Sequence, residues 1–348
     1  MAQNAKNVIV ALLLCMVMAL AACQEAAKNE THLGRLPTVG ILIDDVTNIY
    51  ISLVRDNILK ELDGKANVKL LSANGDGPCQ KQQLESLLRE KVDGLLIHLV
   101  TPQGFPAFLD MIVQADVPVV FFNRDPDLAL LKRYDKSCHV GANAVESGMM
   151  QGEIIASLWG AHPEYDRNGD GKFQYVMLQG LASSAEALHR SEYSIRKAQE
   201  SGLFMEQVGQ SLVCDWLQEE AFIAMKGVLA NGLGDIEIII SNNDAMALGA
   251  IEALAAIGYN TEGGPADKFI PVVGVDAVPE AVAAIDRGVM SATVRQDAAE
   301  TARVTVACLL NSMVGKDFLD GLDKEWDMSG VAIRLPFKAH ATPTSFTH

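Results

Sequence analysis

The stretch IEIIISNNDAMALGAIEALAAIG, residues 236–258, carries the clearest structural signal in the chain. Residues 236–240 form a β-branched run that is typical of a buried parallel strand, and residues 245–257 place apolar side chains at helical spacing. The turn between them contains Ser241, Asn242, Asn243 and Asp244. Open α/β sheets bind ligands at the carboxyl ends of their strands, so this turn predicts a binding site. A capped turn without a ligand is the alternative.

The same alternation of strand and helix continues on both sides of this stretch. Strands are expected at residues 37–43, 68–72, 94–98, 117–122, 173–178, 236–240, 269–275 and 292–294, with residue 212 in a further one. Helices are expected at residues 50–62, 80–90, 104–114, 144–159, 185–201, 219–230, 245–257 and 279–287. This alternation predicts parallel sheets with right-handed crossovers. A chain of 348 residues is too long for one small core, so we expect an α/β protein with two Rossmann-like lobes around a cleft.

The overall composition excludes several classes of protein. Hydrophobic residues make up 49% of the chain and charged residues 21%, as in ordinary folded proteins. The formal net charge of −16 argues against nucleic acid as a partner, because a polyanion needs a basic surface. An acidic surface also keeps an exported protein soluble.

The N-terminus reads as an export signal. Lys6 precedes an apolar segment from Val8 to Ala22, which is short for a membrane span. Residues 20–23, Leu-Ala-Ala-Cys, match the bacterial lipobox, in which the cysteine receives the lipid. We therefore expect a lipoprotein signal peptide at residues 1–22, lipidation of Cys23 and a flexible tether at residues 23–36, which places the protein in the periplasm on a membrane. A plain secretory signal is the alternative.

The chain carries no motif that is typical of an enzyme. It lacks a nucleophile elbow, a P-loop, a zinc motif and a Gly-rich turn after the first strand. The cysteines beyond the signal are interpreted as core thiols, and a disulfide among them stays open: Cys79, Cys138, Cys214 and Cys308. These features favour binding over catalysis.

Residues 166–174, DRNGDGKFQ, follow the spacing of a calcium-binding loop. Side-chain oxygens at the first, third, fifth and ninth positions, together with one backbone carbonyl, would converge on the ion; these ligands are Asp166, Asn168, Asp170, Gln174 and the carbonyl of Lys172. The twelfth position is Met177, so a carboxylate must come from elsewhere. Glu237, on the neighbouring strand, is the candidate. A turn without an ion is the alternative.

Planar polar side chains cluster at the expected ends of strands. They are Asn48, Asn123, Asn243, Asp276 and Gln296, and Glu186 and Arg190 lie one helical turn apart. Amides, carboxylates and guanidinium groups can each bind two neighbouring sugar hydroxyls, while aromatic rings such as those of Tyr50 and Trp216 would cover the C–H faces of the sugar. Each residue alone is equally explained as a cap or turn former.

At this level of detail the chain resembles the bacterial periplasmic glucose/galactose-binding proteins, which are the solute receptors of ABC sugar importers. The resemblance covers residues 38–340 and rests on VPVVFFNRDP, YDKSCHVGANAVESGMMQGEIIA, DRNGDGKFQ, IEIIISNNDAMALGAIEAL and PVVGVDAVPEA. It implies the type 1 fold, in which the chain crosses between lobes three times, near residues 142, 296 and 331. The implied lobes are residues 37–142 with 296–330, and residues 143–295 with 331–348.

The resemblance also implies roles for individual residues. Tyr50 and Trp216 would stack on the sugar ring, and the hydroxyl-binding groups would be Asn123, Arg190, Asn243 and Asp276. Five positions depart from the family pattern: Asn48 replaces an aspartate, Tyr50 a phenylalanine, Ser184 a histidine, Glu186 an aspartate and Gln296 an asparagine. The calcium ligands would be those named above, with Glu237. The resemblance implies structural calcium as the bound ion.

The expected function is capture of a hexose by a monomeric, lipid-anchored protein that delivers it to an ABC permease. D-Glucose is expected to bind better than D-galactose, because Asn48 replaces a carboxylate that contacts the hydroxyl distinguishing the two. Alternatives are presentation of the sugar to a chemoreceptor and binding of another monosaccharide. A sugar-responsive transcription regulator would need a DNA-binding headpiece, where this chain has an export signal. A carbohydrate-active enzyme would need two carboxylates flanking the bond, for which Asp276 and Glu186 are the candidates.

Overall fold

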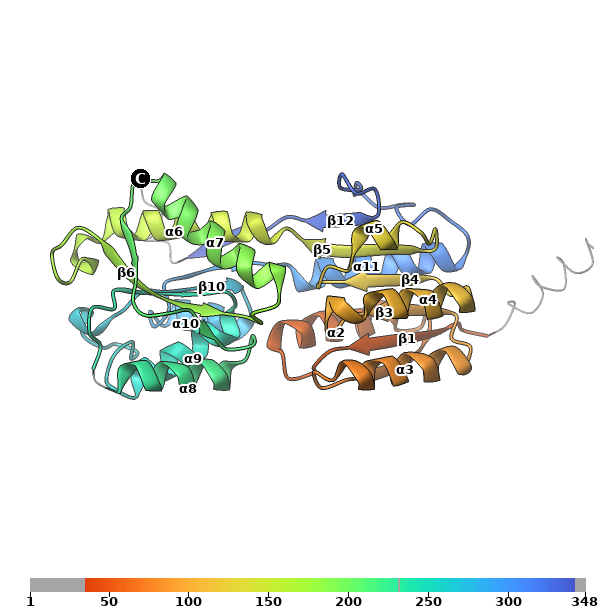
Figure 1. Ribbon diagram of the computed structural model, residues 1–348, viewed down its shortest axis with the longest axis horizontal. Coiled ribbons are helices and arrows are strands. Elements are labelled where there is room, and N and C mark those ends of the chain that lie inside the picture. Colours follow the sequence, from red (N-terminus) through yellow and green to blue (C-terminus); the bar gives the residue numbers. More distant parts are fainter. Residues whose placement is uncertain (1–34, 231, 342–348) are drawn as a thin grey trace, which may run out of the picture.

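Two α/β lobes lie side by side along the long axis of the molecule (Figure 1). The computed structural model describes residues 35–230 and 232–341. The predicted signal peptide, Cys23 and the tether up to residue 34 lie outside the described residues. The expectation of an α/β protein with two lobes and mainly parallel sheets is confirmed.

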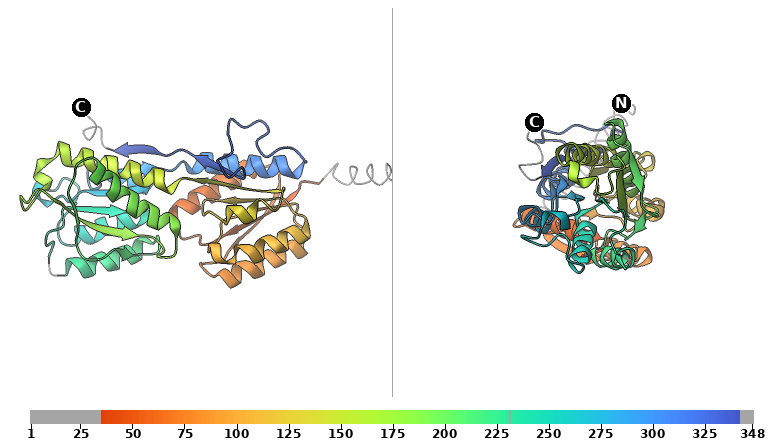
Figure 2. Two further views of the ribbon diagram at one scale, coloured as in Figure 1. Left: turned by 45° about the horizontal axis from the view of Figure 1, so that its top comes forward. Right: turned by 90° about the vertical axis from the view of Figure 1, so that its left-hand side faces the viewer.

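The N-terminal lobe is built on a six-stranded parallel sheet with the order β12-β5-β4-β3-β1-β2. Its strands are β1 (Thr38–Ile43), β2 (Asn67–Ser72), β3 (Gly94–Ile97), β4 (Val119–Phe122), β5 (Ser137–Ala142) and β12 (Ala332–Leu335). Its helices are α2 (Ile49–Leu62), α3 (Gly77–Arg89), α4 (Phe105–Ala115), α5 (Leu128–Leu131) and α11 (Ala298–Met313). Helices cover both faces of this sheet (Figures 1 and 2).

Burial of both faces explains the unbroken apolar run of β1. Successive side chains of a strand point to opposite faces. Ile41 packs with the α2 residue Val54 in one buried cluster, whereas Leu42 packs with Leu84 and Phe108 of α3 and α4 in a second. The sheet is therefore a layer between two cores.

The C-terminal lobe has a sheet with the order β13-β11-β10-β9-β6-β7, and β8 also pairs with β6. Its strands are β6 (Phe173–Gln179), β7 (Met205–Gln207), β8 (Leu212–Val213), β9 (Ile238–Ser241), β10 (Val272–Asp276), β11 (Ala292–Arg295) and the antiparallel edge strand β13 (Lys338–Ala341). Its helices are α6 (Ala144–Ala161), α7 (Ala185–Glu200), α8 (Gln218–Leu229), α9 (Asp244–Ala255) and α10 (Pro279–Asp286). The strand and helix predicted within residues 236–258 are β9 and α9.

The third crossing between the lobes does not lie where the resemblance placed it. The chain leaves the first sheet after β5 and comes back from β11 into α11, which packs on α2. A third crossing near residue 331 is wrong, because β12 pairs with β5, with Ala332 opposite His139, and so belongs to the N-terminal lobe. The chain crosses instead between Leu335 and Lys338, where β13 joins β11.

Helix α11 is the largest element that the sequence analysis did not predict. Its N-terminus carries a usable signal, because the Asp297 side chain accepts from the Glu300 N–H as an N-cap. The β-branched residues Val304, Thr305 and Val306 weaken the helical pattern locally. All three are buried against neighbouring elements, and this packing favours the helix.

Two further features are visible in the described residues. Cys138, Cys214 and Cys308 are buried and Cys79 is half-buried, each as a free thiol. In the described part of the chain, no helix is both long enough and apolar enough to span a membrane.

Candidate ligand-binding site

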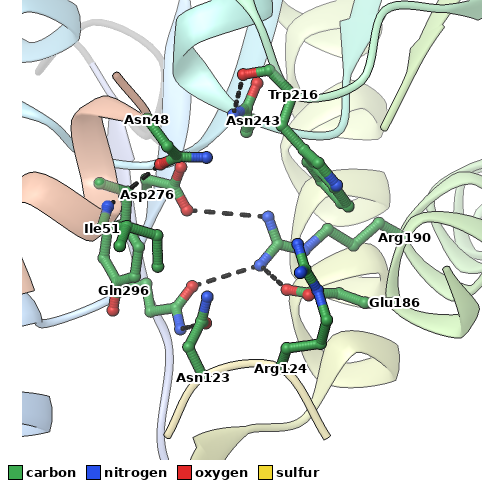
Figure 3. Close-up of a pocket in the computed structure, with 11 residues that line it drawn as sticks. Asn48, Ile51, Asn123, Arg124, Glu186, Arg190, Trp216, Asn243, Asp276 and Gln296 are labelled. Carbon is green, nitrogen blue, oxygen red and sulfur yellow. Dashed lines mark hydrogen bonds and ion pairs between the residues drawn. The ribbon is translucent and has the colours of Figure 1, made fainter. Parts of the chain in front are cut away.

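Nine of the ten residues expected to bind a sugar line one pocket between the lobes (Figure 3). They are Asn48, Tyr50, Asn123, Glu186, Arg190, Trp216, Asn243, Asp276 and Gln296, and Ile51 and Arg124 complete the lining. The cavity between them measures about 30 Å³, which is room for about two water molecules. The pocket is therefore small, and most of the residues that line it are polar.

The N-terminal lobe contributes side chains from the start of α2 and the end of β4. The Asn48 carbonyl oxygen accepts from the Ile51 N–H at 3.0 Å and so caps α2. Its amide nitrogen is then the polar group that Asn48 presents to the pocket. Asn123 has a φ of 61°, a left-handed backbone that is rare outside glycine and is typical of functional sites.

Arg190 of α7 is the centre of the pocket and is only 2% exposed. Its guanidinium donates to the Asn242 carbonyl at 2.7 Å and to Glu186 at 2.6 Å, and one nitrogen lies 3.7 Å from Asp276. Its Nε atom is buried with no hydrogen-bond partner among the described residues. A buried donor left without a partner is costly, so the pocket holds capacity for one more acceptor.

Hydrogen bonds join the two lobes across this pocket. Arg190 Nη2 donates to the Gln296 carbonyl at 3.2 Å, and the Gln296 amide donates to the Asn123 carbonyl at 3.3 Å (Figure 3). Gln296 follows β11, at the second crossing between the lobes. The pocket is thus closed by its own polar groups, and a ligand has to exchange these bonds for its own.

Trp216, in the turn before α8, and Asp276, the last residue of β10, both have backbones with a positive φ. Trp216 has a φ of 70° and Asp276 a φ of 126°. The indole lies 5.7 Å from the Arg190 guanidinium, within the range of a cation–π contact. Burial raises the pKa of the Asp276 carboxyl well above its ordinary value, and Arg190 opposes this shift.

Asn243 both caps a helix and lines the pocket. Its carbonyl oxygen caps α9 by accepting from the Met246 N–H at 3.0 Å, and its amide donates to the Trp216 carbonyl at 3.1 Å. It lines the pocket and also fixes the turn that carries the indole.

Ser184 does not line this pocket. Its hydroxyl accepts from the Ala187 N–H at 3.3 Å and caps α7. It borders a neighbouring cavity of about 480 Å³ that runs between the lobes. A serine is shorter than the histidine of the family pattern, and its oxygen is used by the helix terminus.

Ile51 and Arg124 line the pocket but were not predicted to do so. Arg124 directly follows Asn123, so its place after a buried strand was a usable signal. Ile51 is an apolar helix residue, and no pattern in the sequence distinguishes it from core.

The predicted calcium loop forms a compact turn between α6 and β6. Asp166 accepts from the backbone N–H groups of Gly169, Asp170 and Gly171, and Asn168 accepts from that of Asp170. Gly169 and Gly171 both have a φ of 75°, which glycine adopts without strain. The loop is therefore held by bonds between the side chains of Asp166 and Asn168 and its own backbone.

Two buried groups beside this loop would suit a cation. Glu237 is almost fully buried and accepts from the backbone of Arg167 and Gln174, and burial raises the pKa of its carboxyl. The side-chain oxygen of Gln174, Oε1, is buried with no hydrogen-bond partner among the described residues. In the described ranges no group of three or more His, Cys, Asp or Glu side chains lies close enough together to hold a metal, so the carboxylates of Asp166, Asp170 and Glu237 do not converge on one point here.

Two lobes that enclose a polar pocket at the crossing segments define a solute-binding protein of the periplasmic type. Residues 39–317 match the model of the periplasmic binding protein domain, and the chain belongs to this family. The family implies a periplasmic location and favours binding over catalysis.

The chain is 34% identical to the D-galactose/methyl-galactoside binding periplasmic protein of Haemophilus influenzae, over 86% of this chain and 88% of that protein. It is 25% identical to a putative rhizopine-binding protein of Rhizobium meliloti, over 83% of this chain and 87% of that one.

Solved structures agree in fold. The ABC transporter solute-binding protein of Bacillus halodurans with bound myo-inositol has a TM-score of 0.72 at 22% identity, covering 90% of this chain and 97% of that one. A protein of Actinobacillus succinogenes with bound D-allose has a TM-score of 0.72 at 18% identity, covering 89% and 99%. These likenesses bear on the fold alone.

Proposed function

We propose that this protein captures one hexose between its lobes and delivers it to an ABC importer. The observation that carries the proposal is the buried Arg190, which holds Glu186 and Gln296 by hydrogen bonds and lies near Asp276. Such a set of charged and amide groups matches the paired donors and acceptors of vicinal hydroxyls. The galactose-binding relative at 34% identity supports this ligand class.

Binding must begin with the lobes apart. A cavity of about 30 Å³ is too small for a hexose, since it holds only about two waters. Sugar hydroxyls would replace the bonds that Gln296 makes with Arg190 and Asn123, and the lobes would close again around the ring. The importer would then recognise the closed form.

The test is isothermal titration of the chain that starts after Cys23, freed of bound ligand by unfolding and refolding. We expect saturable binding of one hexose per chain. The absence of heat and of any thermal shift with D-glucose and D-galactose, from folded protein with calcium present, would refute the hexose proposal.

We expect D-glucose to bind better than D-galactose, and Asn48→Asp to reduce the difference about tenfold, which corresponds to one hydrogen bond of about 1.4 kcal/mol. The Asn48 carbonyl is held by α2, so the amide presents donors to the pocket, whereas an aspartate would cap equally well and present an acceptor. Titration of both sugars measures the ratio. The control is Asn143→Asp, because Asn143 caps α6 in the same manner and does not line this pocket.

Gly180→Ala is expected to weaken sugar binding about tenfold, because overpacking a tight contact typically costs about 1–3 kcal/mol. A Cβ on Gly180 would lie 2.2 Å from Trp216 Cε2, so the indole that should stack on the ring would have to move. Titration and the tryptophan fluorescence spectrum report the change. Gly160→Ala is the control, since a Cβ there meets no atom within 4 Å. Equal affinity in both variants would contradict the assigned role of Trp216.

The loop at residues 166–174 is proposed to hold a structural calcium ion. The ligands would be the side chains of Asp166, Asn168, Asp170, Gln174 and Glu237 with the Lys172 carbonyl. The support is the donor set itself, all oxygen, and the buried side-chain oxygen of Gln174, which has no hydrogen-bond partner among the described residues. The bound ion would tie the turn before β6 to the start of β9.

Lipidation of Cys23 is proposed to hold the protein at a membrane. The support is the Leu-Ala-Ala-Cys sequence at residues 20–23. Metabolic labelling with a radioactive fatty acid tests it, and the Cys23→Ala variant should lose both the label and the membrane fraction. Label that persists in the variant would contradict the assignment.

A further inference from the structure

The hydrogen-bond chain of the pocket continues into two buried residues that the binding motif does not include. It runs from Arg190 to Gln296 and on to Asn123. Asn123 Nδ2 then lies 3.4 Å from His98 Nε2, and His98 Nδ1 lies 2.8 Å from Asp44 Oδ1. This series of hydrogen bonds therefore spans both lobes, from α7 to the end of β1.

The two ends of this chain fix the direction of every bond in it. A guanidinium can only donate, so Gln296 presents its carbonyl to Arg190 and its amide nitrogen to Asn123. Asn123 must then accept with its carbonyl, which leaves its amide nitrogen toward the imidazole of His98. The amide can donate only to an unprotonated Nε2, so the His98 proton lies on Nδ1.

The far end of the chain agrees with this assignment. Asp44 is a carboxylate acceptor for His98 Nδ1–H, and Arg124 Nη2 lies 3.3 Å from its second oxygen. Burial by itself would raise the pKa of the Asp44 carboxyl. His98 and Arg124 outweigh burial and hold this pKa below its ordinary value. Arg124 is itself fixed by the carbonyls of Leu99 and Val100.

The imidazole of His98 is buried against an aromatic ring. Its side chain is 1% exposed and its ring centroid lies 5.6 Å from that of Phe122. A ring turned about its axis would bring a carbon to Asp44 and leave the carboxylate without this donor, at the cost of a lost charge-assisted bond.

We propose that His98 and Asp44 are positioning residues that hold the Asn123 carboxamide with its carbonyl oxygen toward the cleft. Asn123 consequently offers an acceptor, and the ligand group that meets it is a donating hydroxyl. The orientation of Asn123 is inferred from the hydrogen bonds alone. The statement that it meets a sugar hydroxyl rests on the proposed function.

The first test does not need a ligand. Long-range ¹H–¹⁵N spectra of the sugar-free protein, with the His98 signals identified by their loss in His98→Gln, report the tautomer. We expect a protonated Nδ1 and a bare Nε2. A proton on Nε2 would overturn the proposal, whatever sugar the protein binds.

The second test separates positioning from a general structural effect. His98→Phe is expected to weaken hexose binding about tenfold in the wild-type background, and to have no effect when Asn123 is already alanine. His98→Gln, whose amide can accept from Asn123 and donate to Asp44, should keep most of the affinity. Equal losses in the Phe and Gln variants, or a loss that persists in Asn123→Ala, would overturn the proposal. If wild type binds no hexose while the tautomer is as expected, the sugar assignment fails and the positioning geometry stands.

Discussion

Arg190→Ala is expected to reduce hexose affinity by about 30- to 4000-fold, because removing one member of a buried charge pair typically costs about 2–5 kcal/mol. The guanidinium is the common partner of Glu186 and Gln296, with Asp276 nearby. Its removal would leave two carboxylates facing each other in a buried pocket with no cation between them. Isothermal titration measures the loss, and the melting temperature of the ligand-free variant reports any change in stability.

Two variants make this test specific. Arg190→Lys keeps the charge and loses the planar fork, so we expect affinity between those of wild type and Arg190→Ala. Arg196→Ala is the matched control, because Arg196 lies on the same helix, pairs with Glu200 at the surface and is far more exposed. If Arg190→Ala and Arg196→Ala bind hexose with the same affinity, this pocket is not the sugar-binding site.

Removal of calcium is expected to lower the melting temperature by about 5–10 °C. An ion at a hundred times its dissociation constant stabilises by about 2.7 kcal/mol, and each kcal/mol shifts the melting temperature of a domain of this size by about 2–4 °C. The melting temperature is measured with calcium and with a chelator. The physical reason is that the ion would neutralise Glu237 and Asp166, which lie close together beside the same turn.

Asp170→Asn should weaken this calcium response, and Asp170→Ala should abolish most of it. The asparagine keeps an oxygen for the Lys172 N–H and for the ion but lacks the charge, whereas alanine lacks both the oxygen and the charge. Asp267→Asn is the control, because Asp267 is an acidic residue beside the loop, contacted by Arg167 through its backbone only. A wild-type melting temperature that is the same with calcium and with chelator would refute the calcium site.

The local elements of the fold could be predicted from the sequence because their signals are local. The β-branched run of β9 and the helical spacing of α9 each lie within a dozen residues, and the strand ends determine where polar side chains gather. The residues alone made Arg190 and Trp216 candidates, and the resemblance to a known family added the specific role expected of each.

The tertiary structure decided which strands pair and which side chains form hydrogen bonds with each other. β12 pairs with β5 across nearly two hundred residues, and no sequence period records such a pairing. Ser184 has a polar side chain that could bind a ligand, but its hydroxyl oxygen accepts from the Ala187 N–H at the start of α7. In the sequence His98 is a lone histidine with no evident partner. The fold places Asp44 beside one ring nitrogen and Asn123 beside the other.

The sequence by itself therefore determined the alternation of strands and helices, the loop at residues 166–174 and most of the polar side chains of the pocket. Only the tertiary structure decided which lobe holds β12, which oxygens serve helix caps, and which way each amide of the pocket faces. The physical reason is that propensity and periodicity act between near neighbours in the chain, whereas the direction of a buried hydrogen bond depends on what lies at the far end of its network.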